Sequence, residues 1–231
     1  MATEILFSDL KAWLDAQPEN TASTPYEIII KNAPRGGFNT YTNAITRFVR
    51  VVDMEMAEGV TSIGERSFIS CTNLISINIP IGITSIIAQA FQGCKSLTNV
   101  TLPGTLTSIG NMAFVGCSVL AAIYIPYGVT SIGNSAFDAC SSLTNVSLPG
   151  TLTSIGNMAF RNCKSMQIAY VYCLFSETLM KSESFKGTPS NTRVLVNPTV
   201  LSGWQSATLT NYGFASGARV ESLYTKWVRV I

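Results

Sequence analysis

A repeat of 23 residues runs through the middle of the chain and constrains its fold more than any other feature of the sequence. Phenylalanine recurs at this step from Phe68 to Phe91 and onward to Phe160, and a cysteine follows three residues after each, from Cys71 to Cys163. One such unit cannot bury both of its sides, whereas stacked copies cover one another. The repeat therefore predicts a solenoid in which each copy forms one rung.

The copy at residues 97–117 reads LTNVTLPGTLTSIGNMAFVGC and indicates how one rung is built. Leu97, Val100 and Leu102 mark a short strand with these side chains pointing inward. Pro103 lacks an amide hydrogen and so ends the strand. The Thr-Ser-Ile-Gly stretch is expected to return along the outer side, and the Ala-Phe pair to form one turn of helix. Strands of successive rungs would then form a parallel sheet with a spacing of roughly 4.8 Å.

Identical side chains are expected to stack on themselves in this arrangement. Phenylalanine, isoleucine, leucine and cysteine ladders would lie inside the solenoid, and threonine and serine ladders outside. Residues 98–117 and 144–163 differ at only three positions, which are Thr101/Ser147, Val115/Arg161 and Gly116/Asn162. So close a match indicates duplication of a block of two repeats.

The ends of a solenoid expose its core, and the sequence beyond the regular repeats supplies candidate caps. We expect residues 1–51 to form an N-terminal cap, residues 52–166 five repeats, and residues 167–231 a degenerate repeat with a C-terminal cap. Within the first cap we expect a helix, a strand and a second helix. The first helix is suggested by Leu6, Leu10, Trp13 and Leu14, the strand by residues 26–30, and the second helix by residues 40–50.

The C-terminal segment keeps only traces of the repeat. Residues 184–187, Ser-Phe-Lys-Gly, echo the Ala-Phe-x-Gly-Cys segment without its cysteine. Residues 193–198 predict a closing strand that ends at a proline. A short helix at 200–204 and a terminal strand at 224–231 are expected after it.

The repeats resemble those of a known family. Residues 125–137, IPYGVTSIGNSAF, and the run AFQGCKSLTNV at residues 90–100 resemble the BspA-like, or Treponema pallidum-type, leucine-rich repeats. The resemblance covers roughly residues 52–187. It implies the α/β class and a right-handed leucine-rich-repeat solenoid with its parallel sheet on the inner curve, little helix and a cap at each end. It also implies a surface or secreted protein of host-associated bacteria, and it carries over no catalytic residue.

One position departs from the family pattern. Ile87 stands where the other repeats carry a glycine, such as Gly64 and Gly110. A turn that needed a positive φ would strain an isoleucine, so we expect a turn that tolerates a negative φ at this position.

The composition argues against catalysis and against a bound cofactor. The chain has no histidine and no Cys-x-x-Cys motif, which removes imidazole bases and the common zinc sites. The cysteine ladder is therefore interpreted as small apolar core packing rather than a metal or redox array. A cluster of carboxylates near the first repeats is interpreted as a solvated acidic face rather than an acid–base pair; it comprises Asp53, Glu55, Glu58 and Glu65.

Charge and hydropathy narrow the range of partners. Charged residues make up 12% of the chain and the net charge is +2, which does not favour nucleic-acid binding. No apolar run is long enough to span a bilayer, so membrane insertion is not expected. Residues 1–4 show neither the basic nor the apolar segment of a leader peptide.

The outward residues of the predicted strands form the candidate binding surface. Most are short and polar, and tyrosines interrupt them; tyrosine is enriched at binding surfaces. Tyr170 and Tyr172 have an alternative interpretation as residues packed beneath the C-terminal cap. The candidate protein-binding residues are Tyr124, Tyr127, Tyr170, Tyr172, Asp53, Glu55, Asn78, Asn99, Thr101 and Asn145.

Two functional hypotheses remain open. The first is a monomeric, non-catalytic adhesin at the cell surface or secreted, whose partner is a host-matrix or cell-surface protein, as the resemblance implies. The alternative is an interaction scaffold in the cytoplasm, in the cell envelope or in a phage. A leader peptide in the full reading frame would favour the first. An enzyme is disfavoured because no nucleophile has a base beside it in the sequence pattern.

Overall fold

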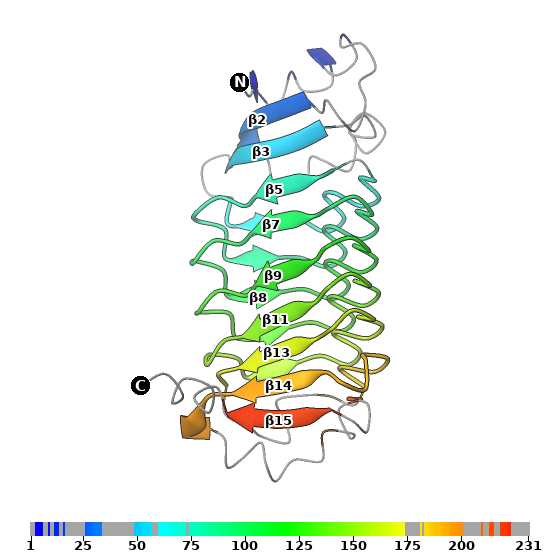
Figure 1. Ribbon diagram of the computed structural model, residues 1–231. Helices are drawn as coiled ribbons and strands as arrows, with labels where there is room; N and C mark the ends of the chain where they lie inside the picture. The colour runs from blue at the N-terminus through cyan, green and yellow to red at the C-terminus, as the bar shows by residue number, and fades with distance from the viewer. Residues whose placement is uncertain are drawn as a thin grey trace, which may run out of the picture.

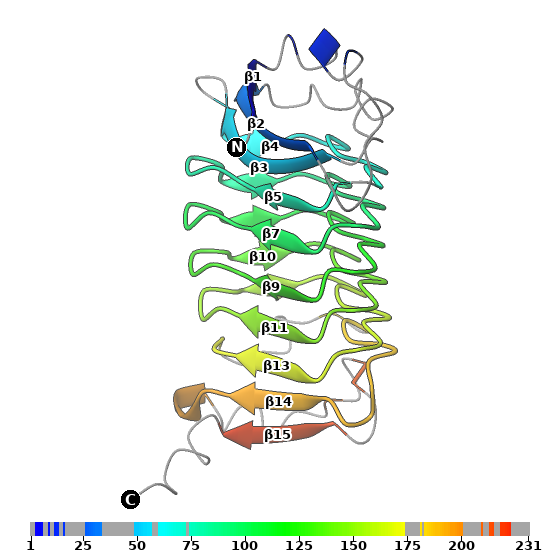
Figure 2. The same cartoon turned by 45° about the horizontal axis from the view of Figure 1, so that its top comes forward.

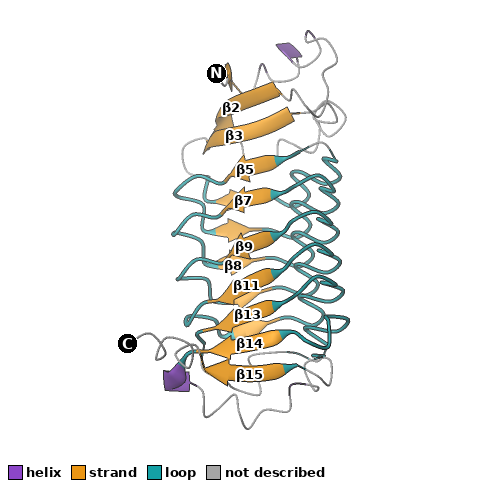
Figure 3. Cartoon of the chain, viewed as in Figure 1, coloured by secondary structure: helices purple, strands orange, loops and turns teal. Residues whose placement is uncertain are grey.

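The computed structural model is an elongated stack of rungs (Figure 1). It describes the following parts of the chain: residues 3–6, 9, 12–13, 16, 26–33, 49–56, 60–72, 74–173, 181, 183–200, 209, 213–214 and 218–222. Strands, turns and loops make up almost all of the described residues, and helix is scarce (Figure 3). The predicted leucine-rich-repeat solenoid is confirmed, with about six turns of parallel strands.

One long face of the stack carries a parallel strand from each rung, and we call it the front face. Its strands form a pair, β5-β7, and a five-stranded sheet in the order β9-β11-β13-β14-β15. The register follows the repeat, since Ile77 pairs with Val100 and Ile123 with Val146. The front strands are β5 (Ser76–Asn78), β7 (Asn99–Thr101), β9 (Ala122–Tyr124), β11 (Asn145–Leu148), β13 (Ile168–Val171), β14 (Arg193–Val196) and β15 (Arg219–Ser222).

A second sheet lies behind the first, and we call its side the back face. Figure 2 shows β10 of this sheet behind the front strands. The repeat predicts only that the Thr-Ser-Ile-Gly stretch returns along this outer side. The return is nevertheless paired between rungs, because each Ser-Ile segment buries its isoleucine and leaves its backbone free to bond the next copy. The back strands, in the order β12-β10-β8-β6-β4, are β4 (Ser62–Ile63), β6 (Ser85–Ile86), β8 (Ser108–Ile109), β10 (Ser131–Ile132) and β12 (Ser154–Ile155).

The threonine ladder outside the back sheet is bonded along its length. The Thr107 hydroxyl donates to the Thr84 carbonyl at 2.9 Å, and the Thr130 hydroxyl donates to the Thr107 carbonyl at 3.2 Å. Each threonine therefore fastens its rung to the preceding one, which explains why this position is conserved between the copies within the chain.

The helical turn expected at the Ala-Phe pair is wrong. These residues form turns that combine hydrogen bonds within a rung, as from the Cys117 amide to the Phe114 carbonyl at 3.2 Å, with hydrogen bonds between rungs, as from the Phe91 amide to the Ala113 carbonyl at 2.7 Å. Met112, two residues before Phe114, has a φ of 56°, and its counterparts in other rungs are also positive. A left-handed residue cannot continue a right-handed helix, so the backbone turns toward the neighbouring rung instead.

The glycine position that Ile87 replaces does not require a positive φ, as expected. Among the described residues, neither Ile87 nor Gly110 has one. A β-carbon added to Gly110 would lie 2.8 Å from the Ile87 carbonyl carbon and the Ala88 nitrogen. Glycine therefore serves a close approach between rungs here rather than an unusual backbone angle.

A ladder of stacked phenylalanine rings fills the core. Successive ring centroids from Phe68 to Phe160 lie 4.9 to 5.2 Å apart with nearly parallel planes. The ladder continues past the regular repeats to Phe185 at 5.0 Å and Phe214 at 4.1 Å. The ring stack therefore continues although the sequence steps before these two rings are longer than the regular repeat.

The cysteine ladder lies beside the rings and is buried, as predicted. The Cys94 thiol donates to the Phe68 carbonyl at 3.0 Å, and the Cys117 thiol to the Phe91 carbonyl at 3.2 Å. All six cysteines are buried, and none forms a disulfide. Burial raises the pKa of the Cys71 thiol to about 12, and burial likewise raises the pKa of Cys163. Such thiols stay protonated and pack as small apolar groups.

The N-terminal segment contributes a parallel three-stranded sheet, β1 (Thr3–Leu6), β2 (Tyr26–Ala33) and β3 (Val49–Met56), in that order. The strand expected at residues 26–30 is observed as part of β2. The two expected helices are wrong at one end each, since Leu6 lies in β1 and Val49 and Arg50 lie in β3. Both strands pair with β2, and this pairing outweighs the local helical spacing. Ala12 and Trp13 are helical, and most of the second expected helix lies outside the described residues.

At the other end, β14 agrees with the strand expected at residues 193–198. A short 3-10 helix, η3 (Pro198–Val200), follows it, and β15 adds a last strand that was not expected. The terminal strand expected at 224–231, and the short helix at 200–204 apart from Val200, lie outside the described residues. The division into caps at 1–51 and 167–231 and repeats at 52–166 stays a prediction.

Candidate functional site

The outward side chains of the front face form two rows along the solenoid. In one row Asn78 pairs with Thr101, and Tyr124 pairs with Ser147, which pairs with Tyr170. The other row begins at Ser76, which is buried, and continues through Asn99, Ala122, Asn145 and Ile168. From β5 to β13 both rows consist entirely of uncharged residues, and most are short. The predicted residues of β5, β7, β9, β11 and β13 therefore lie on one face, although Asn78, Asn145 and Tyr170 are half-buried.

Three tyrosines stand out from this surface. Tyr124 is 70% exposed, Tyr127 74% and Tyr172 41%. They line a depression of about 350 Å³, which we call the tyrosine groove; its other lining residues are Ile125, Ser147, Pro149 and Gly150. Tyr172 lines this groove, and the alternative in which Tyr170 and Tyr172 pack beneath the C-terminal cap stays a prediction, because most of that cap lies outside the described residues.

The turn after β9 holds Tyr127 outward. The Val129 amide donates to the Pro126 carbonyl at 3.2 Å, and Gly128 has a φ of 114°. Proline first and glycine third suit a tight turn whose second residue projects into solvent. The next rung clamps the turn, since the Gly128 amide donates to the Thr151 hydroxyl oxygen at 3.1 Å.

The opposite wall follows from the pairing of β11 with β13. The Tyr172 amide donates to the Leu148 carbonyl at 3.0 Å, so the ladder extends one residue beyond the strand. Gly150 also lines the groove, and a β-carbon at Gly150 would lie 3.2 Å from the Tyr172 carbonyl oxygen. Because residue 150 is glycine, no side chain stands at this position between Tyr127 and Tyr172. The sequence analysis did not single out Gly150, although it occupies the repeat position of Tyr127.

Charged residues of the front face lie toward its C-terminal end. The Arg193 guanidinium donates to the Glu221 carboxylate at 3.1 and 2.5 Å, across β14 and β15. Asp53 and Glu55, predicted to contribute to the surface, belong to β3, and their side chains lie outside what the structure describes. The described residues that line the tyrosine groove are all uncharged.

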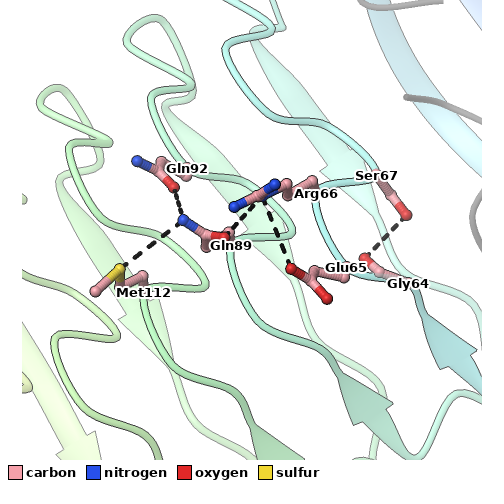
Figure 4. Close-up of polar contacts among 7 residues, drawn as sticks. All are labelled: Gly64, Glu65, Arg66, Ser67, Gln89, Gln92 and Met112. Carbon is pink, nitrogen blue, oxygen red and sulfur yellow. Dashed lines mark hydrogen bonds and ion pairs between the residues drawn. The ribbon is translucent and has the colours of Figure 1, made fainter. Parts of the chain in front are cut away.

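Glu65, one of the carboxylates near the first repeats, belongs to a group of polar contacts at the edge of the N-terminal rungs. Figure 4 shows Arg66 between Glu65, at 3.8 Å, and Gln89, whose Oε1 accepts from Arg66 Nε at 2.8 Å. Gln89 donates in turn to Gln92 at 2.7 Å, and the Ser67 hydroxyl donates to the Gly64 carbonyl. Glu65 and Arg66 are more than half exposed, so solvent screens their ion pair and it adds little to the stability of the fold.

A second depression, of about 490 Å³, runs over the back face. The serine, glycine and asparagine rows of the Ser-Ile-Gly-Asn segments line it, with Lys181 at one end. The amides here are engaged in a ladder: Asn111 Oδ1 accepts from the Asn134 amide, and Asn134 Oδ1 from the Asn157 amide, both at 2.8 Å. These side chains hold rungs together, which leaves the front face as the stronger candidate for binding.

In the described part of the chain, no three histidine, cysteine, aspartate or glutamate side chains come together to hold a metal ion. Within the same residues, no helix is both long and apolar enough to cross a membrane.

Comparison with known proteins agrees with this architecture. The family model described as BspA type leucine rich repeat region matches six copies over residues 45–193. A leucine-rich-repeat protein of T. pallidum is 28% identical with a TM-score of 0.55, over 64% of this chain and 68% of that one. The pneumococcal vaccine antigen PcpA has a TM-score of 0.57 at 17% identity, over 72% of this chain and 40% of that one. A search of curated protein sequences gave no significant match. Leucine-rich repeats are generally non-enzymatic scaffolds for protein–protein interaction.

Proposed function

Because the chain belongs to the BspA-type leucine-rich-repeat family, we propose that it is a non-catalytic module that binds a protein partner through its front face. The tyrosine groove is the single observation that carries this proposal. A tyrosine ring buries a large area at a small entropy cost and keeps a hydroxyl to pair. The short side chains around the groove let a partner approach the sheet closely.

Tyr124 and Tyr127 are the proposed anchors, because they are the most exposed aromatic side chains of the described front face. Their place near the middle of the stack would shield an anchor from water. Tyr172 faces them across the groove. Asp53 and Glu55 are proposed to orient a basic partner at the N-terminal rim. The remaining proposed contacts are Tyr170, Asn78, Asn99, Thr101 and Asn145.

We further propose that the protein works as a monomeric surface or secreted adhesin whose partner is a host-matrix or cell-surface protein. BspA-like proteins are often surface-associated, which supports this location. A specific observation supports the alternative of an intracellular, envelope or phage scaffold: none of the six cysteines forms a disulfide, as is usual in reducing compartments.

A binding panel of purified matrix proteins, read by biolayer interferometry, tests the proposal. For any protein that binds, the double variant Tyr124→Ala/Tyr127→Ala should weaken binding by about 2 kcal/mol or more, within hot-spot range. Val119→Ala is the matched control, because Val119 is a 40% exposed apolar residue of the same rung that lies outside the groove. Urea melts should show little loss of stability in either variant. A partner that binds the double variant unchanged would move the site to the caps or the back face.

A further inference from the structure

The turns that follow the front strands are of two alternating kinds. Those at residues 80–83 and 126–129 place glycine third, with φ of 103° at Gly82 and 114° at Gly128. The turns of the rungs that follow each of these place threonine third, and that threonine clamps the preceding turn. Thr105 Oγ1 accepts from the Gly82 amide at 3.2 Å and donates to the Ile83 carbonyl at 2.8 Å.

The same alternation governs which side chains project from the turns. The second turn residue is Ile81, 87% exposed, in one rung and Tyr127 two rungs later. The rungs that follow each of them carry Gly104 and Gly150. A β-carbon at Gly104 would have open space around it, and Gly150 forms part of the floor of the tyrosine groove. Along the solenoid the order is therefore ridge, slot, ridge, slot, with Tyr172 closing the second slot. We call this the ridged row.

The distance between the two slots can be compared with the repeat distance of each regular peptide conformation. Parallel strands lie roughly 4.8 Å apart, so slots two rungs apart are separated by roughly 9.6 Å. A polyproline II helix repeats every three residues and rises about 3.1 Å for each, so residues three apart lie about 9.3 Å apart on one side. An extended strand repeats at about 6.6 Å, which does not match. An α-helix is about 10 Å across and cannot enter a gap left by one missing row of side chains.

The chemistry of the lining agrees with a proline-rich chain. Such a chain offers carbonyl acceptors and, at each proline, no amide donor. The groove offers hydroxyl donors from Tyr124, Tyr127, Tyr172 and Ser147 on an apolar, uncharged surface. Among the described residues, its lining contains no carboxylate, carboxamide or guanidinium side chain, the groups that usually hold the hydroxyls of a sugar. An uncharged peptide therefore complements the groove better than a glycan.

On the basis of the proposed function, we infer that the ridged row binds a proline-rich segment in the polyproline II conformation. The segment lies along the solenoid axis, with residues three apart in the slots at Gly104 and Gly150 and its rings against the tyrosines. Aromatic-lined grooves suit this conformation because the peptide is already ordered and loses little entropy on binding.

Fluorescence anisotropy with a labelled oligoproline of about nine residues, long enough to span both slots, tests the inference. The wild-type chain should bind it, and a glycine-serine peptide of equal length should not bind. Tyr124→Ala/Tyr127→Ala should weaken binding at least about tenfold. Gly104→Val places a side chain in the other slot, where its β-carbon would have no atom within 4 Å, so it should also weaken binding severalfold while the urea melt changes little. Val119→Ala should behave as wild type.

The outcomes separate the two proposals. If oligoproline does not bind, or if Gly104→Val binds it as the wild type does, the inference is overturned. The inference is also overturned if the chain binds maltohexaose, a sugar, instead of oligoproline. If a matrix protein binds through Tyr124 and Tyr127 while oligoproline does not, the proposed function stands and only the polyproline II inference fails. If oligoproline binds but both variants leave it unaffected, the site lies elsewhere and the inference is equally wrong.

Discussion

Removing one ring from the phenylalanine ladder tests the fold most directly. Phe114 is fully buried and stacks on Phe91 at 5.0 Å and on Phe137 at 5.2 Å, with planes within 5° of parallel. Phe114→Ala removes a buried aromatic side chain, which costs about 3–5 kcal/mol in a tightly packed core. We expect the upper part of that range, because two flanking rings lose contact area and the rungs on either side keep the cavity from collapsing.

Urea melts followed by circular dichroism measure this loss, with Val119→Ala as the exposed control expected to change stability by less than about 0.5 kcal/mol. An unchanged denaturant slope would show that the stack still unfolds as one unit. A broadened or biphasic transition would mean that the missing ring uncouples the rungs on its two sides, as nearest-neighbour coupling in a repeat protein allows. A loss under about 1 kcal/mol for Phe114→Ala would refute the reasoning, because the ring would then contribute no packed surface.

Two further predictions follow from the turns and the thiols. Gly128→Ala should destabilise the protein by about 1–2 kcal/mol, because its φ of 114° disfavours a β-carbon, whereas Gly104→Ala should be neutral or stabilise it by up to about 1 kcal/mol; equal thermal shifts for the pair would contradict the turn assignment. Burial raises the pKa of the Cys71 thiol from 9.0 to about 12, so the unfolded chain loses this proton first and stability should fall as pH rises from 9 to 12. Cys71→Ala should make that decline shallower in chemical melts, and an identical slope would exclude Cys71 as a contributor.

The regular rungs could be predicted from the sequence because each position of the repeat stacks on the same position of the next copy. The step from Phe68 to Phe91 specifies both the rung and the stacking, and the buried isoleucines, leucines and cysteines follow from it. The back sheet was missed because two residues, Ser-Ile, are too few to show an alternation. Its signal is the repeated threonine, whose hydroxyl bonds the preceding rung, and that contact is between copies rather than within one.

The termini and the groove could not be derived in the same way. Leu6 shares helical spacing with Leu10, but its backbone pairs with β2, a contact between segments far apart in the sequence. Tyr124 and Tyr127 were recognised because large residues interrupt a row of short ones. Gly150 was not recognised, because the absence of a side chain is visible only once its neighbours on both sides are placed.

The duplication inside the chain explains why ridges and slots alternate at all. The matching blocks at residues 98–117 and 144–163 each contain a Pro-Gly-Thr-Leu turn, and these turns supply the slots at Gly104 and Gly150. The turns at Ile81 and Tyr127 lie outside the matching blocks and supply the ridges. Copying a unit of two rungs thus sets a spacing of roughly 9.6 Å between slots, although each rung advances only half as far. Residues between the copies can change the ridge side chain, from isoleucine to tyrosine, without disturbing the phenylalanine core. Specificity at the front face can therefore vary while the stacking that maintains the fold stays the same.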